Sequence, residues 1–268
     1  MTATMPVEHG QTAQNWTVKK MKQWAAEVWQ CDVSRSALRT LLKGKRMSWK
    51  KCQKVLQKAN PEKRAAFISE FKALYERVCR GEVLLLYVDQ AHVHRDMDLG
   101  YTWASTEMVA WRLSHCPSLQ ERINWYGAYD FNRGACFIWN EGSCNQVHTG
   151  QFLRHLADWV GDVNAEDVII WDGAPWHRGR LARDTAAELG FTLLPLPGYS
   201  PDLNPIEGLW KWLREEVTRN HSYATMRALF DTCKAFIDRI NEDPQALISR
   251  LWPKFELDPE FEKLLVSN

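Results

Sequence analysis

The sequence of 268 residues predicts an α/β fold: a mixed β-sheet flanked by helices and preceded by a small all-α module. After residue 81, continuous apolar runs of strand length alternate with amphipathic helical segments, whereas before it apolar residues recur only with helical spacing. The net charge of the chain also changes sign at about residue 81. Residues 1–80 carry 17 Lys and Arg against 6 Asp and Glu, a net charge of +11, and residues 81–268 carry 17 against 27, a net charge of −10. The chain therefore combines a basic helical part with an acidic α/β part.

The basic part begins with two short helices. Thr17 can cap a helix over residues 18–29, and Ser34 can cap the helix that follows. Six Lys or Arg then occur among residues 43–54. Two helices joined by a short turn and followed by a basic extension are the outline of a helix-turn-helix or winged-helix module, expected over residues 16–55. The alternative is a solvated helical hairpin that binds nothing.

A basic module suits a polyanion, because Lys and Arg side chains displace the counterions that DNA phosphates hold. Double-stranded DNA is therefore the expected partner. The residues expected to contact it are Arg35, Ser36, Arg39, Lys43, Lys45, Arg46, Lys50 and Lys51. Around this module we expect a disordered polar tail over residues 1–15 and a linker helix over residues 56–80, which starts at Asn60-Pro61.

The acidic part contains the elements of the expected sheet. Three apolar runs are typical of strands buried on both faces: residues 83–88, 167–171 and 191–196. A turn signal at Asn132-Arg133-Gly134 predicts a hairpin between the first two runs. The expected order is strand, hairpin, helix, strand, helix, strand, helix over residues 81–230, followed by a C-terminal helical extension over residues 231–268.

The helix after the third run follows a proline-rich stretch, LPGYSPDLNPIEGLWKWLREEV, residues 196–217. Asn204 is a preferred N-cap, Pro205 suits the first helical position, and Glu207 lies three residues after the cap, as in a capping box. The helix carries one apolar stripe, made by Ile206, Leu209, Trp210, Leu213 and Val217. A capped surface helix would by itself explain the carboxylate at position 207.

Asp89 and Asp172 each follow an apolar run directly. Ligands of open α/β sheets collect at the carboxyl ends of strands, so neighbouring strands would bring both carboxylates to one sheet edge, where Glu207 can join them. Three carboxylates that meet repel one another unless protons or cations compensate their charge. Two Mg²⁺ or Mn²⁺ ions suit such oxygen ligands and can activate a water or a 3′-hydroxyl for phosphodiester cleavage. Taken singly, an aspartate at a strand end is more often a turn residue or a helix cap than a catalytic residue.

Three blocks of the acidic part resemble the catalytic blocks of bacterial insertion-sequence transposases in the mariner-like DDE superfamily. They are LLLYVDQAHVHRDMDLGYTWA, VIIWDGAPWH and the proline-rich stretch quoted above, and the similarity covers about residues 81–230. Thirty-four residues separate Asp172 from Glu207, a spacing that this family uses. The resemblance implies an RNase H-like catalytic domain in which Asp89, Asp172 and Glu207 are the catalytic, metal-binding triad.

The same resemblance implies a function. Members of this family move a DNA element by cut and paste: they cut at its inverted-repeat ends and insert it at a short target, usually TA. A homodimer on DNA is expected, because two ends must be held together. The N-terminal helices resemble the second helix-turn-helix of these proteins. Only fifteen polar residues precede them, so we do not expect the first, as in a shortened copy, the second product of a split reading frame or a remnant.

Two positions depart from the family pattern. Gln90 stands where many relatives have Glu, and Gly173 where many have Asn. Further candidates for active-site support, through contacts to the scissile phosphate, a water or the DNA strand, are His92, His94, Arg95 and His177.

Composition excludes several other classes. No apolar run reaches the ~18 residues of a membrane span and the N-terminus lacks a signal-peptide pattern, so we expect a cytoplasmic, nucleoid-associated protein with no membrane partner. Seven scattered cysteines without a C-x-x-C pair argue against a disulfide framework or a structural zinc site. Two rival functions remain: a truncated, catalytically silent relative that binds DNA as a repressor, and a structure-specific RNase H-fold resolvase.

Overall fold

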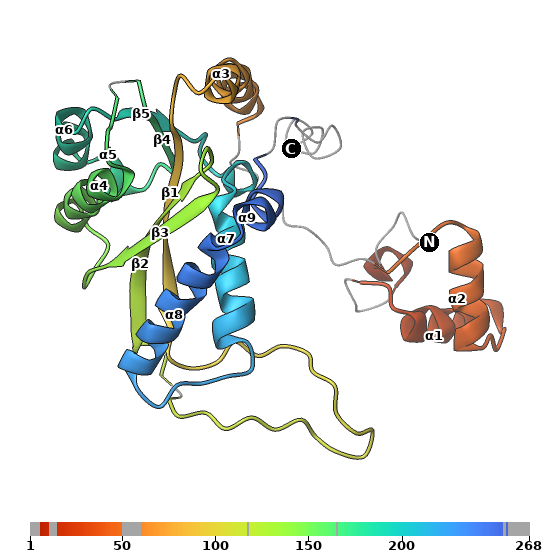
Figure 1. Ribbon diagram of the computed structural model, residues 1–268. Coiled ribbons are helices and arrows are strands. Elements are labelled where there is room, and N and C mark those ends of the chain that lie inside the picture. Colours follow the sequence, from red (N-terminus) through yellow and green to blue (C-terminus); the bar gives the residue numbers. More distant parts are fainter. Residues whose placement is uncertain are drawn as a thin grey trace. The chain divides into compact units, whose positions relative to one another are not determined.

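The computed structural model describes residues 6–10, 15–49, 60–116, 118–164, 166–253 and 256 (Figure 1). The chain divides into two compact units, residues 1–54 and residues 55–268, which we describe separately. Within the described ranges, no helix combines the length and apolarity that crossing a membrane requires.

The first unit is helical, as predicted. It contains the 3₁₀ turn η1 (Pro6–His9) and the helices α1 (Val18–Trp29) and α2 (Arg35–Gly44). Thr17 and Ser34 cap the two helices as expected, since their hydroxyls accept hydrogen bonds from the amides of Lys20 and Ala37. The η1 turn differs from the disordered tail expected over residues 1–15. In this turn, His9 packs against the rings of Trp16 and Trp24, with ring centroids 5.9 and 5.6 Å away.

The second unit is built on a five-stranded sheet with the strand order β3-β2-β1-β4-β5. Its strands are β1 (Leu85–His94), β2 (Arg122–Asp130), β3 (Ala135–Asn140), β4 (Val168–Trp171) and β5 (Thr192–Pro195). The first three pair in antiparallel fashion, and β4 and β5 continue the sheet parallel to β1. The mixed sheet and the predicted hairpin are therefore confirmed.

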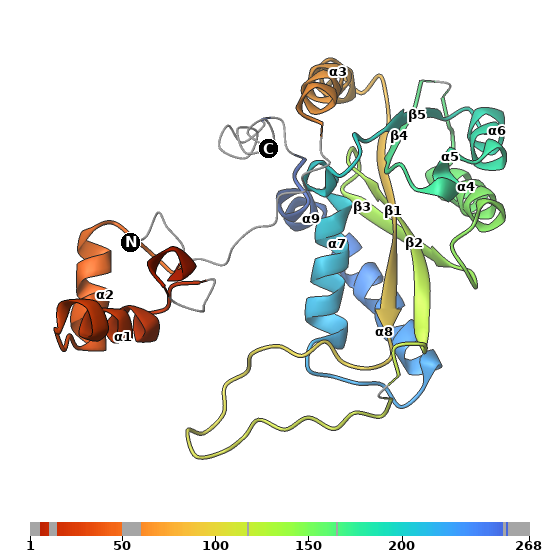
Figure 2. The same cartoon turned by 180° about the vertical axis from the view of Figure 1, so that it is seen from behind.

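Helices cover both faces of this sheet (Figures 1 and 2). The helical elements are α3 (Pro61–Cys79), α4 (Gln146–Val160), α5 (Pro175–Arg178), α6 (Arg180–Glu188), η2 (Pro201–Leu203), α7 (Ile206–Leu213), the π-helical turn η3 (Arg214–Thr218), α8 (Met226–Asn241) and α9 (Pro244–Arg250). Because successive strand residues face opposite sides, β1 contributes to two cores. Tyr87 and Val93 pack with α3, α7, α8 and α9, whereas Leu86 and Val88 pack with α4 and α6.

Three local expectations need correction. The apolar run over residues 83–88 does not mark the end of its strand, because β1 continues to His94 by pairing with β2. The run over residues 191–196 gives a half-exposed edge strand, β5, rather than a strand buried on both faces. Asn204 does not cap α7: Pro205 holds that position, and the buried amide oxygen of Asn204 has no hydrogen-bond partner. There is consequently no capping box to account for Glu207.

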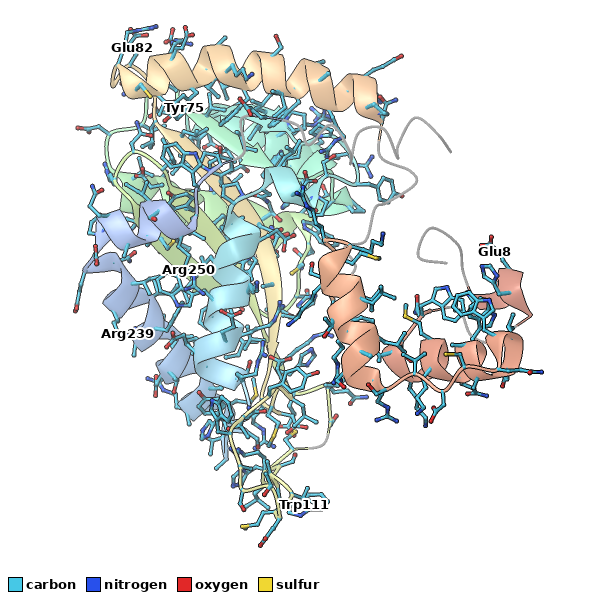
Figure 3. All side chains as sticks on the ribbon, turned by 90° about the vertical axis from the view of Figure 1, so that its right-hand side faces the viewer. Glu8, Tyr75, Glu82, Trp111, Arg239 and Arg250 are labelled. Carbon is cyan, nitrogen blue, oxygen red and sulfur yellow. The ribbon has the colours of Figure 1, made fainter. Side chains whose placement is uncertain are left out.

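A long loop joins β1 to β2, and we call its outer part, residues 99–113, the arm. Figure 3 shows Trp111 at its far end. The arm exposes seven large apolar side chains: Leu99, Tyr101, Trp103, Met108, Val109, Trp111 and Leu113. Trp103 is fully exposed, at 101% relative accessibility. Exposed apolar surface of this extent is typical of an interaction site.

Candidate active site

The sheet places Asp89 and Asp172 next to each other. Tyr87 on β1 pairs with Ile170 on β4, and the two aspartates follow two residues later on parallel neighbouring chains. Asp172 is the first residue after β4, as predicted, whereas Asp89 lies in the middle of β1. The site therefore forms where the short strand β4 ends and β1 continues alongside β2.

Asp89 is buried, with 8% of its surface exposed. Its Oδ2 accepts a hydrogen bond from the indole Nε1 of Trp210 on α7 at 3.1 Å. Burial, followed by the negative charges of Glu207 and Asp172, raises the pKa of Asp89 to about 8. Within the described residues, no Lys or Arg forms an ion pair with this carboxyl group. The site therefore gathers acidic groups without a cationic side chain paired to Asp89, and this environment favours the protonated form of Asp89.

A glycine makes room for the indole that reaches Asp89. Gly127 on β2 is the strand partner of Asp89. A Cβ atom added at Gly127 would lie 2.4 Å from Cη2 of Trp210, closer than any side chain could tolerate. The indole can therefore lie against the sheet only because position 127 has no side chain.

Asp172 has different surroundings, since its side chain is about half exposed. Its Oδ1 accepts hydrogen bonds from Nδ1 of His177 at 2.6 Å and from the amide of Ala174 at 3.0 Å. Burial alone would raise the pKa of Asp172, but the hydrogen bonds from His177 and from the Ala174 amide hold the pKa below its ordinary value.

Glu207 lies on the first turn of α7, and its carboxyl group is coupled to the other two. Burial raises the pKa of Glu207, the charge of Arg214 opposes this change, and the charge of Asp172 adds to it. The structure thus brings Asp89, Asp172 and Glu207 within electrostatic reach of one another. Their carboxylates are nevertheless not gathered as ligands in this structure: in the described part of the chain, no three His, Cys, Asp or Glu side chains are arranged as a metal site.

The donor set still fits a hard divalent cation. All three candidate ligands are carboxylates, the ligand type that Mg²⁺ and Mn²⁺ prefer. A cation would also relieve the repulsion that raises the pKa of Asp89. The residues therefore fit such a group in chemistry and charge.

Comparison with known families decides the assignment. Residues 84–230 match the model of the DDE superfamily endonucleases, and residues 12–71 match a winged helix-turn-helix family. The chain belongs to the DDE superfamily of endonucleases. The matched DDE region spans the whole sheet and contains all three acidic residues.

Individual relatives of this DDE endonuclease include a protein of an insertion element. The chain is 22% identical over 240 residues to the insertion element IS630 uncharacterized 39 kDa protein of Shigella sonnei, covering 89% of this chain and 68% of that protein. It is 30% identical over 104 residues to the uncharacterized protein y4pE/y4sA of Sinorhizobium fredii, covering 38% of this chain and 74% of that protein. Together with the DDE and helix-turn-helix matches, the insertion-element relative identifies an insertion-sequence transposase of the DDE superfamily, as the sequence blocks predicted.

Solved structures show the same fold. A pre-cleavage Mos1 transpososome aligns with a TM-score of 0.63 at 15% identity, over 98% of this chain and 84% of that one. The mariner Mos1 paired-end complex with Mg aligns with a TM-score of 0.63 at 18% identity, over 98% of this chain and 76% of that one. The predicted RNase H-like fold of the DDE domain is thereby confirmed.

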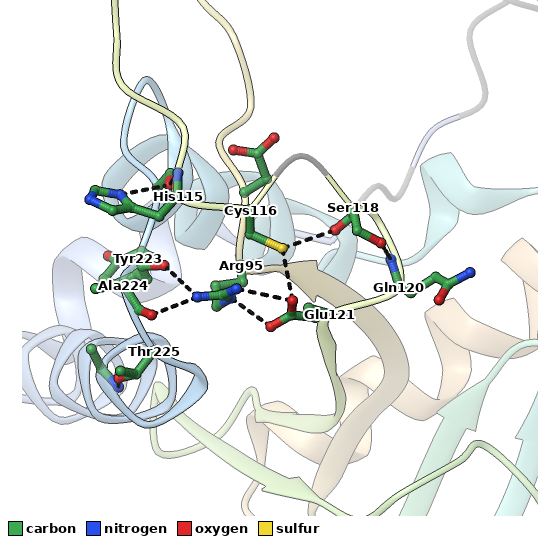
Figure 4. A network of polar contacts seen from close by, with 12 residues as sticks. Arg95, His115, Cys116, Ser118, Gln120, Glu121, Tyr223, Ala224 and Thr225 are labelled. Atoms are coloured by element: carbon green, nitrogen blue, oxygen red, sulfur yellow. Dashed lines mark hydrogen bonds and ion pairs between the residues drawn. The ribbon is translucent and has the colours of Figure 1, made fainter.

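The other candidate residues lie in varied settings around the DDE site. On β1, His92 and His94 face the side of the sheet opposite to Asp89, because strand side chains alternate. Burial lowers the pKa of His92. Arg95 is held at the base of the β1–β2 loop, where its guanidinium binds Glu121 and the carbonyls of Tyr223 and Ala224 (Figure 4). His177 is the one of these four that contacts a candidate ligand.

The residues expected to contact DNA belong to the first unit. The six that the structure describes are exposed on α2 and just after it: Arg35, Ser36, Arg39, Lys43, Lys45 and Arg46. Lys50 and Lys51 lie outside the described residues.

Sequence reasoning missed Trp210 as a site residue and assigned it only to the apolar stripe of its helix. The available signal was Gly127, a glycine inside a strand of bulky residues, which marks a close approach by another group.

Proposed function

We propose that this transposase cuts phosphodiester bonds at the inverted-repeat ends of its element and joins the freed 3′-hydroxyls to target DNA by cut and paste, usually at TA. The observation that carries this proposal is the electrostatic interaction of Asp89, Asp172 and Glu207 where β4 ends beside β1, with the pKa of Asp89 raised to about 8. A buried acidic group with a pKa raised by its acidic neighbours is unfavourable for stability alone and suits an active site.

In this proposal, Asp89, Asp172 and Glu207 hold two Mg²⁺ or Mn²⁺ ions. Bound there, divalent ions would activate the attacking oxygen and neutralise charge that develops on the phosphate. The Mg and Mn forms of the Mos1 paired-end complex support the choice of metals. The protein itself orients the carboxylates: Trp210 and Gly127 fix Asp89, His177 and Ala174 fix Asp172, and the first turn of α7 carries Glu207.

DNA recognition belongs to the basic first unit in this proposal. The match to a winged helix-turn-helix family and the exposed cations of α2 support it. We propose that Arg35, Ser36 and Arg39 face the bases, while the basic residues from Lys43 to Lys51 neutralise phosphates. The proposed domain boundaries remain those expected from the sequence, with the helix-turn-helix module at 16–55, the linker helix at 56–80 and the catalytic domain at 81–230.

We further propose that the active form is a homodimer that holds two DNA ends. The exposed apolar arm supports this assembly, because it provides contact surface for a second copy. A Trp103→Ser/Trp111→Ser variant should bind one end as the wild type does but lose most complexes that contain two ends, as measured by gel shift with two DNA lengths. Normal pairing of ends by this variant would contradict a role of the arm.

One assay tests the activity against its two rivals. The protein is incubated with a duplex that carries the inverted repeat and with a branched duplex, in Mn²⁺ or Mg²⁺, and compared with Asp172→Ala and with the surface control Asp162→Ala. Metal-dependent cutting near the repeat end by the wild type and Asp162→Ala, but not by Asp172→Ala, is the expected result. Binding without cutting would favour the repressor, and cutting of branched DNA without end preference would favour the resolvase.

A further inference from the structure

A series of hydrogen bonds connects Trp176 through Gln90 and His177 to Asp172. The indole Nε1 of Trp176 donates to Oε1 of Gln90 at 2.8 Å. Nε2 of Gln90 lies 2.6 Å from Nε2 of His177. Nδ1 of His177 lies 2.6 Å from Oδ1 of Asp172 and 3.2 Å from its backbone carbonyl. Four side chains on β1, α5 and the end of β4 are thus linked in series.

The chemistry of the first group fixes the direction of every later bond. An indole N–H can only donate, so Trp176 must face the amide oxygen of Gln90. The amide nitrogen of Gln90 therefore faces His177 and donates to its Nε2. That nitrogen accepts, so the proton of the neutral ring is on Nδ1, which donates to Asp172. The row runs one way, from Trp176 to the carboxylate.

Packing holds the imidazole in this position. His177 is buried, with 1% of its surface exposed, and its ring stacks on Trp171 with centroids 4.5 Å apart and planes 4° apart. Trp171 is the last residue of β4 and directly precedes Asp172, while Gln90 directly follows Asp89 on β1. The ring is therefore fixed between the two strands that carry the candidate aspartates.

We propose that His177 is a positioning residue for Asp172, and that Gln90 and Trp176 set the tautomer in which it acts. Both ring nitrogens have protein partners, so the ring does not bind a water or the scissile phosphate. Its N–H instead commits Oδ1 of Asp172 to the protein and directs the other carboxylate oxygen to the metal. Groups that orient a metal ligand in this way typically change metal affinity by about 10–100-fold when removed. This inference rests on the proposed metal-dependent function of Asp172.

Two substitutions of His177 distinguish the role of Nδ1 from the role of Nε2. In His177→Asn the amide nitrogen takes the place of Nδ1 and can still donate to Asp172. In His177→Gln the amide nitrogen takes the place of Nε2, and the donor to Asp172 is lost. The half-saturating Mn²⁺ concentration, measured by calorimetric titration of the metal without DNA, should rise at least about 10-fold in His177→Gln and less than about 3-fold in His177→Asn. His155 is an exposed histidine whose ring contacts that of Trp139, so His155→Gln is the matched control and should bind Mn²⁺ as the wild type does.

The tautomer can be read directly in the metal-free protein. In ¹⁵N-histidine-labelled protein, two-bond proton–nitrogen spectra should show His177 with its proton on Nδ1. Gln90→Met removes the donor to Nε2, and Trp176→Phe frees the Gln90 amide to turn, so each variant should show a mixture of the two tautomers. Circular dichroism confirms that each variant is folded.

A proton on Nε2 in the folded wild type, or equal Mn²⁺ affinities of His177→Asn and His177→Gln, would overturn the proposal. The spectra and titrations need no DNA and no turnover. Absence of DNA cutting by the wild type would therefore count against the proposed function, while the tautomer and the metal affinities would still decide the role of His177.

Discussion

Asp89 and Asp172 occupy matching positions on neighbouring strands, yet their surroundings move their pKa values in opposite directions. Asp89 is buried and receives one side-chain hydrogen bond, and its pKa rises to about 8. Asp172 is half exposed and receives two hydrogen bonds at one oxygen, and its pKa falls. At neutral pH without metal, Asp172 is charged whereas Asp89 keeps a proton. The comparison teaches that two neighbouring strands can place a ligand that is already charged beside one that becomes charged on metal binding.

The largest effect on activity should come from removing the carboxyl group of Asp89 or of Asp172. Asp89→Asn and Asp172→Asn should each lower the cleavage rate by at least about 10²-fold, because each removes a group that organises the transition state.

The effects of the two substitutions on stability should differ. The folded pKa of Asp89 lies above its ordinary value of 3.8, so its contribution to stability is full below that value and is lost as the pH rises through about 8. Asp89→Asn should therefore raise the thermal midpoint of the metal-free protein at pH 8 but not at pH 4.

Asp172 should behave in the opposite way. Its lowered pKa contributes stability above the ordinary carboxyl pKa, and that contribution is lost as the pH falls through the folded value. Asp172→Asn should consequently not raise the midpoint at pH 8. Equal shifts in the two variants, measured by thermal unfolding at both pH values, would remove the contrast between the two carboxylates.

A smaller effect should follow when the indole beside Asp89 is displaced. Gly127→Ala places a methyl group 2.4 Å from the Trp210 ring, and overpacking of this kind destabilises a core by about 1–3 kcal/mol. Gly150→Ala on α4 is the matched control, since its methyl would meet no atom closer than the Thr185 hydroxyl at 3.3 Å. Chemical denaturation measures both variants. If Gly127→Ala lowers the free energy of unfolding no more than Gly150→Ala does, the sheet and α7 can separate without loss of stability.

The smallest effect concerns the hydrogen bond alone. Trp210→Phe keeps a ring but removes the donor to Asp89, a bond worth about 0.5–1.5 kcal/mol. Because that donor favours the charged carboxylate, its loss should raise the pKa of Asp89 further. The pH at which Mn²⁺ affinity stops rising should then move upward by about one unit or less. Trp212→Phe, whose indole instead donates to Glu216, should leave this pH profile unchanged.

Sequence reasoning predicted those features that depend on local pattern. The caps at Thr17 and Ser34, the hairpin turn and the strand that ends just before Asp172 follow from short-range chemistry and were confirmed. The match of residues 84–230 to the DDE family agrees with the span expected from the quoted blocks.

Features that depend on distant partners could not be predicted in the same way. The end of β1 is set by its pairing with β2, so the polar residues after Asp89 did not reveal the longer strand. The role of Trp210 depends on Gly127, which lies in another strand and only meets the indole after folding. The exposed arm and the row of hydrogen bonds that starts at Trp176 likewise arise from tertiary structure rather than from any local motif.

The central claim is that Asp89, Asp172 and Glu207 together bind divalent metal, and Mn²⁺ calorimetry tests it most directly. Titrations at pH 7 in two buffers of different ionisation enthalpy report both affinity and proton release. The wild type should bind Mn²⁺ and release about one proton, which comes from Asp89. Asp89→Asn, Asp172→Asn and Glu207→Gln should each weaken binding, and Asp89→Asn should also abolish the proton release. Unchanged Mn²⁺ binding in all three variants, or no binding by the folded wild type, would contradict the account.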